Sequence, residues 1–114
     1  MAKTILTGNP ELIRDINTQS VIRTIMEHGT ISRAAIASHL GRTKATVSAI
    51  VQILLDRGLI LEVGNDDTKK GRKPILLKMD ETCGYIISLD LATETITLMT
   101  ASLLGSNCHI YQHE

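Results

Sequence analysis

Two helical segments joined by a very short turn limit the folds open to this chain. Ser32 is placed to cap the first segment, residues 33–40, which ends at Gly41. Thr43 is placed to cap the second, which carries an apolar stripe at helical spacing: Val47, Ile50, Val51 and Leu54. A turn this tight directs the second helix across the first, so the segment predicts a helix-turn-helix.

A further amphipathic helix is predicted before this pair. Asn9 and Pro10 have the pattern of a helix entry, and apolar residues then recur at steps of three to five until Gly29. The pattern allows one helix or two. Together with the pair that follows, it gives three helices delimited by capping residues and glycines.

A β-hairpin is predicted after the helices. Residues 59–63 and 75–79 are short apolar runs on either side of the polar segment 64–74, the pattern of two strands with a long tip. Three helices followed by such a hairpin predict a winged helix-turn-helix domain over residues 1–80.

A second β region, residues 81–114, follows this domain. Strands are predicted at 85–91 and 95–103, with a turn at 105–107 and a possible third strand at 108–111. The predicted fold class is therefore α+β, in which a complete small domain precedes the first strands of an incomplete one.

Composition and cysteine usage exclude several classes of protein. Hydrophobic residues make up 43% of the chain, no apolar run is long enough for a membrane span, and no signal peptide is recognisable. Cys83 and Cys108 fit no disulfide framework or metal motif, and His109 and His113 have no further ligands beside them. We therefore expect a cytoplasmic protein without metal, cofactor or membrane association.

The formal net charge is zero, but the charges are unevenly distributed. All 12 Lys and Arg residues lie between Lys3 and Lys78, against eight acidic residues in residues 1–80, which gives this part +4 and the remainder −4. A basic first domain is compatible with a nucleic-acid partner.

The second helix of the pair carries the predicted base-reading surface. With its apolar stripe inward, its remaining side chains are small or hydrogen-bonding, which suits entry into a major groove. Lys44, Thr46, Ser48 and Gln52 are the candidate specificity residues. The capping Thr43 and the helix N-terminus suit a phosphate.

The hairpin tip carries the predicted backbone contacts. Lys69, Lys70, Arg72 and Lys73 fall within five positions, and Arg72 is the candidate for a minor groove because Gly71 and Pro74 flank it. The full set of predicted DNA-binding residues is Ser32, Arg33, Arg42, Thr43, Lys44, Ala45, Thr46, Ser48, Ala49, Gln52, Lys69, Lys70, Arg72 and Lys73.

These motifs resemble the ROK family (repressors, open reading frames and sugar kinases), which includes xylose and N-acetylglucosamine repressors. The resemblance covers nearly the whole chain and rests on residues 17–21, 29–33 with 36–37, 43–48 with 54–55, 58–60 with Glu62 and Gly64, 71–74 and 84–91. It implies a repressor of sugar-utilisation genes that binds operator DNA through paired winged helices. The repressor releases the operator, or changes its affinity for it, when a sugar or phosphosugar occupies the second domain. Residues 84–91 resemble the first strand of the family's actin-like sugar-binding domain.

The resemblance also sets limits. It implies that the inducer residues lie beyond residue 114, that the pairing surfaces of a homodimer or higher oligomer belong to the second domain, and that the protein works in the bacterial cytoplasm, at the nucleoid. Ala35 stands where the family often has an acid that would complete a capping box with Ser32. Residues 90–94 lack the glycine of the family kinases' phosphate loop, which indicates a regulator and not an enzyme.

Two other readings remain open on the sequence. The chain could be a fragment of a ROK-type sugar kinase, with Asp90 as the phosphate-loop acid. It could also be a winged helix used for protein contact, with the basic tip bound to an acidic partner.

Overall fold

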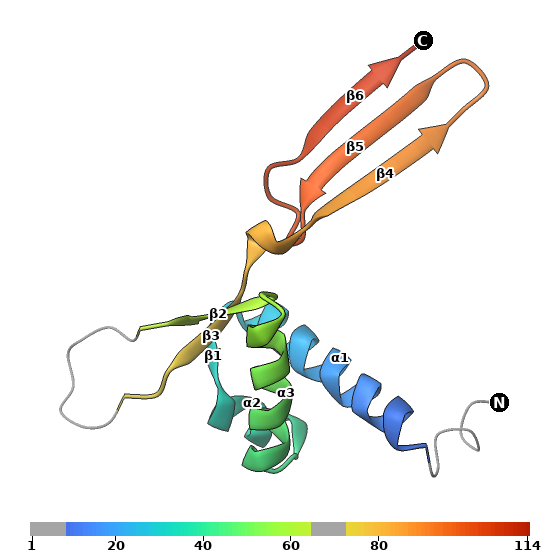
Figure 1. Ribbon diagram of the computed structural model, residues 1–114. Coiled ribbons are helices and arrows are strands. Elements are labelled where there is room, and N and C mark those ends of the chain that lie inside the picture. The colour runs from blue at the N-terminus through green and yellow to red at the C-terminus, as the bar shows by residue number, and fades with distance from the viewer. Residues whose placement is uncertain (1–8, 65–72) are drawn as a thin grey trace. The chain divides into compact units, whose positions relative to one another are not determined.

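The computed structural model describes residues 9–64 and 73–114 and separates into two compact units (Figure 1). The first unit runs up to Met79, and the second spans Asp80–Glu114. In the described ranges, no helix has the length and apolarity needed to cross a membrane.

The first unit begins with one continuous helix, α1 (Pro10–His28). The Asn9 side chain caps it by accepting backbone N–H groups of Glu11 and Leu12 at 3.1 and 3.3 Å. The helix ends at Gly29, which has a φ of +74° and donates its N–H to the Ile25 carbonyl. Both predicted ends are therefore confirmed, and the pattern that allowed two helices corresponds to one.

Helices α2 (Arg33–Leu40) and α3 (Lys44–Asp56) form the predicted pair. The Ser32 hydroxyl accepts the Ala35 N–H at 3.2 Å, and the Thr43 hydroxyl accepts the Thr46 N–H at 3.2 Å, so both predicted caps are present. Between the helices, Gly41 adopts the left-handed conformation, with φ +61° and ψ +35°.

Replacing Gly41 with alanine is expected to destabilise the first unit by about 1 kcal/mol, because an L-residue resists the left-handed conformation. A Cβ at this position would meet no atom within 4 Å, so the cost is backbone strain alone. The change in the free energy of unfolding is measured by urea denaturation, with the circular-dichroism signal of the helices as the readout. Gly64→Ala is the matched control, since Gly64 has open space and no left-handed φ. Equal stability of the two variants would refute the strain argument.

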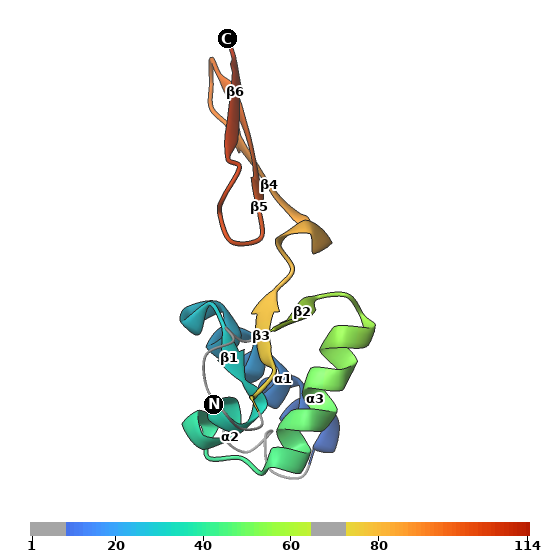
Figure 2. The ribbon, with the colours of Figure 1, turned by 90° about the vertical axis from the view of Figure 1, so that its left-hand side faces the viewer.

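A small antiparallel sheet, in the order β1-β3-β2, completes the first unit (Figure 2). The predicted hairpin is confirmed as β2 (Ile60–Val63) and β3 (Leu76–Met79), each one residue shorter than predicted. Strand β1 (Ile31–Ser32), between α1 and α2, was not predicted. It pairs with β3 through Ile31 and Leu77. The sheet therefore joins the start of α2 to the β2–β3 hairpin, which is the wing of this domain.

The core of the first unit lies between the three helices and the inner face of this sheet. Each of these elements contributes at least one fully or nearly fully buried side chain, and the predicted stripe of α3 is confirmed as part of this core. The buried cluster consists of Val21, Ile25, Ile31, Ile36, Ala37, Val47, Ile50, Val51, Leu54, Ile60, Leu77 and Met79.

The second unit is a three-stranded antiparallel meander preceded by a short 3-10 helix, η1 (Glu81–Cys83). Its strands are β4 (Tyr85–Leu91), β5 (Ile96–Ser102) and β6 (His109–His113). The strands predicted at 85–91 and 95–103 are confirmed with small changes at their ends, and the third extends two residues further than predicted. All residues of β4 and β6 are exposed, so the unit buries little of its apolar surface.

Candidate nucleic-acid interface

The side of α3 that faces away from the core is open to solvent. Lys44, Ala45, Ser48 and Gln52 are all exposed there. Ala49 is also exposed, but it lines a hollow between α3 and α1. Near the helix N-terminus the side chains are short, apart from Lys44, so the backbone of this helix can approach a ligand closely. Such a surface has the size and chemistry that major-groove entry requires.

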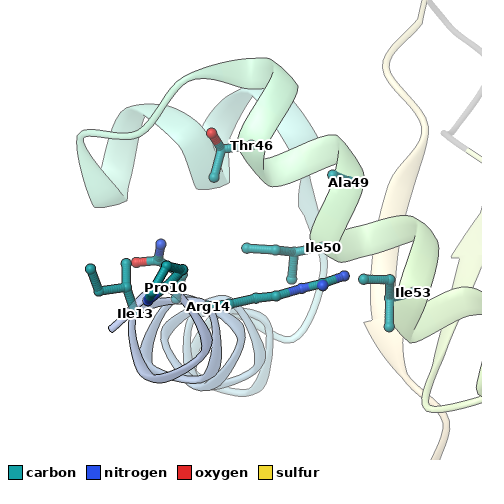
Figure 3. Close-up of a pocket in the computed structure, with 8 residues that line it drawn as sticks. Pro10, Ile13, Arg14, Thr46, Ala49, Ile50 and Ile53 are labelled. Atoms are coloured by element: carbon teal, nitrogen blue, oxygen red, sulfur yellow. The ribbon is translucent and has the colours of Figure 1, made fainter. Parts of the chain in front are cut away.

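Thr46 does not share this orientation. It is half-buried, and its hydroxyl lies 2.8 Å from that of Thr43. Figure 3 shows it on the side of α3 that faces α1, across a hollow of about 520 Å³ that Ile13 and Arg14 also line. Thr46 is thus only partly open to solvent, because it lies at the edge of the apolar stripe and on the side of α3 toward α1.

Gln52 is exposed as predicted, but its amide already has a partner. Its Nε2 donates to Asp56 Oδ1 at 2.8 Å, one helical turn further along α3. A base contact by Gln52 would require the amide to exchange this hydrogen bond for one to DNA.

A second hollow, of about 500 Å³, brings together basic residues from three parts of the first unit, and we call it the basic hollow. Arg33 comes from the start of α2, Lys44 from the start of α3, and Lys73 from the segment leading into β3. Ser32 lines it as well, at the position that caps α2. Four of the predicted DNA-binding residues thus meet in one place, where a helix N-terminus and cations both favour an anion.

Arg33 has an acidic neighbour that the sequence analysis missed. Its Nη2 lies 2.9 Å from Glu62 Oε1 on β2. The strand pattern could have indicated its position, because successive side chains of a strand point to opposite faces. Glu62 is two residues from the buried Ile60 and therefore falls on the inward face of β2. Its partner could not be read from the sequence.

Three predicted wing residues, Lys69, Lys70 and Arg72, lie outside the described residues. Arg42 is exposed in the turn after α2. It lines a small hollow of about 80 Å³ with Asn17 of α1 and Thr46 of α3, apart from the basic hollow. Its predicted DNA contact would therefore be made from a different part of the surface.

Other chemistry is sparse in the described ranges. Within residues 9–64 and 73–114, no group of three or more His, Cys, Asp or Glu side chains is arranged to hold a metal ion. Cys83 is half-buried and Cys108 is exposed, and both are free thiols. The basic hollow and the open face of α3 carry most of the described residues that were predicted to bind DNA.

Comparisons with known proteins find relatives of this chain among transcriptional regulators. The model of the MarR family matches residues 17–66, from within α1 to beyond the end of β2. A putative xylose repressor from Caldicellulosiruptor sp. (strain Rt8B.4) is 39% identical over 98 residues, which cover 86% of this chain and 25% of that protein.

Two further relatives give the same picture. The xylose repressor of Staphylococcus xylosus is 40% identical over 85 residues, covering 73% of this chain and 22% of its own length. The DNA-binding transcriptional dual regulator NagC of Escherichia coli (strain K12) is 34% identical over 97 residues, covering 83% and 24%. The chain therefore spans about a quarter of the length of the relatives it matches.

A solved structure supports the fold. The crystal structure of a ROK family transcriptional regulator, a homolog of the Escherichia coli MLC protein, superposes with a TM-score of 0.72 at 23% identity and covers 90% of this chain and 26% of that one. The predicted α+β class, three helices followed by antiparallel strands, is confirmed.

Proposed function

Because this chain is a homologue of the N-terminal quarter of ROK-family regulators, as its motifs predicted, we propose that it is the operator-binding part of a bacterial repressor of sugar-utilisation genes. The observation that carries the proposal is the basic hollow. Arg33, Lys44 and Lys73 converge there from α2, α3 and the base of the wing, beside the start of the open face of α3.

In this proposal the two surfaces have different roles. The exposed side chains of Ser48 and Gln52 on α3 read base edges in a major groove, while the wing and the hollow, which includes Lys44, hold backbone phosphates. Phosphate contacts fix the position of the helix but carry no sequence information. Some residues therefore contribute to the affinity for any DNA, and others to the specificity for the operator.

The rest of the regulator is proposed on the same basis. A single winged module buries only about 600 to 1,000 Å² on DNA, and tight repressors gain affinity by presenting two modules to a two-fold symmetric site. We therefore propose that the protein acts as a homodimer or higher oligomer in the bacterial cytoplasm, at the nucleoid. A sugar inducer would act through the domain to which the second unit belongs.

A catalytic role is less well supported. Asp90, the candidate phosphate-loop acid of a kinase, lies on the exposed strand β4. The turn that follows is closed by a hydrogen bond from the Ala92 N–H to the Thr95 carbonyl and contains no glycine, so its backbone is not shaped to wrap a phosphate. We propose that the chain has no enzymatic activity.

Removing two cations of the hollow tests the proposal directly. Each phosphate contact contributes about 0.9 to the slope of log affinity against log salt, so Lys44→Ala with Lys73→Ala is expected to reduce the slope by about 1.8. At about 0.15 M salt the affinity for a random-sequence duplex should fall roughly 10- to 30-fold. Fluorescence anisotropy across a salt series gives both values.

The matched control removes the same charge elsewhere. Arg23 on α1 and Lys78 on β3 are exposed and lie outside the hollow, so Arg23→Ala with Lys78→Ala should leave the slope nearly unchanged. Equal slopes for the two double variants would show that the hollow does not contact DNA. In that case the reading as a protein-contact module would gain support.

A further inference from the structure

The first residue of α2 is tied to the wing by an ion pair. Arg33 Nη2 and Glu62 Oε1 are 2.9 Å apart, although the residues are 29 positions apart in the sequence. The two side chains are 27% and 44% exposed. The pair therefore lies at the surface, where a competing anion can reach the guanidinium.

Glu62 reaches Arg33 because of the register of the sheet. It is paired with Leu77, which is itself paired with Ile31 on the other side of β3. Residues in one row of an antiparallel sheet share a face, and this face covers the core. The carboxylate thus extends from the inward face of β2 toward the helices, in place of the apolar side chain expected at that position.

The same guanidinium lines the basic hollow with Lys44 and Lys73. A carboxylate and a phosphate bind a guanidinium in the same way, through parallel N–H donors, so they compete for it. We propose that Glu62 limits the affinity for DNA by holding the Arg33 side chain that would otherwise pair with a backbone phosphate. This inference rests on the proposed DNA-binding function and assigns Glu62 a regulatory role within that site.

The size of the effect follows from the exposure of the pair. A half-exposed ion pair is weak, so removing the competitor should raise DNA affinity by about two- to fivefold. Because Arg33 then acts as a full phosphate contact, the slope of log affinity against log salt should steepen by up to about 0.9. By weakening a phosphate contact, Glu62 would keep the affinity for non-specific DNA low relative to the affinity for an operator, which also offers base contacts.

The test uses the whole 114-residue chain and a fluorescent random-sequence duplex. The proteins are the parent, Glu62→Gln, Arg33→Gln and the double variant, titrated between about 50 and 200 mM salt. Glu27→Gln is the control, because Glu27 is an exposed acid on α1 and does not line the basic hollow. A melting curve for each variant reports whether the first unit stays folded.

We expect Glu62→Gln to bind more tightly than both the parent and Glu27→Gln. In the Arg33→Gln background the same change should give no more than the control does. A gain in affinity that persists without Arg33 would overturn the inference. Weaker binding by a folded Glu62→Gln would also overturn it, because the ion pair would then position the wing for DNA binding. If the parent binds the duplex but Glu62→Gln is unchanged, the inference alone fails. No binding by the parent would overturn the proposed function itself.

Discussion

Placing glutamate at Ala45 is expected to abolish DNA binding while leaving the fold intact. Ala45 is exposed in the first turn of α3, where the proposed groove contact requires a small side chain. A carboxylate there would face the phosphates and base acceptors of DNA, and such like-charge contact costs about 3 kcal/mol or more, which is on the order of 100-fold in affinity. Glutamate is a good helix former and an acid is favourable in a first turn, so stability should not fall.

The measurement is anisotropy on both a random duplex and the regulatory region of the host gene. Gln19→Glu serves as the control, since it adds the same charge at an exposed position of α1 that does not line the basic hollow. It should weaken binding only slightly, because a distant surface charge is screened by salt. Unaltered binding by Ala45→Glu would place the open face of α3 away from DNA and refute the proposed docking.

Truncating Ile36 to alanine is expected to remove much of the stability of the first unit. Ile36 is fully buried in α2, within the cluster to which all three helices and the sheet contribute. Deleting such a side chain leaves a cavity and typically costs about 2–5 kcal/mol, whereas a whole domain is stable by only about 5–15 kcal/mol. The melting temperature of the helical signal should fall by about 10 °C or more.

Ile16→Ala provides the same chemical change at a partly exposed site. Ile16 lies on α1, is 39% exposed and does not belong to the buried cluster, so its truncation leaves no enclosed cavity and should shift the melting temperature by only a few degrees. Comparable losses for the two variants would show that the first unit does not depend on this core. DNA binding should fall with the folded fraction in Ile36→Ala and remain near the parent level in Ile16→Ala.

The sequence by itself determined the parts of the fold that local interactions set. Asn9, Ser32 and Thr43 cap helices because their side chains reach backbone groups two or three residues away. Gly29 and Gly41 end helices because only glycine tolerates their positive φ easily. The apolar stripe of α3 likewise predicted its buried side, since periodicity alone fixes which positions share a face.

Only the tertiary structure decided how distant segments meet. Strand β1 exists because Ile31 finds Leu77 across 46 positions of sequence, and two residues are too few to show a strand pattern. Thr46 faces α1 because of how that helix packs, which periodicity could not show for a position at the edge of the stripe. The hollow that unites Arg33, Lys44 and Lys73, and the placement of Glu62 beside it, depend on sheet register and helix packing, which no short stretch of sequence specifies.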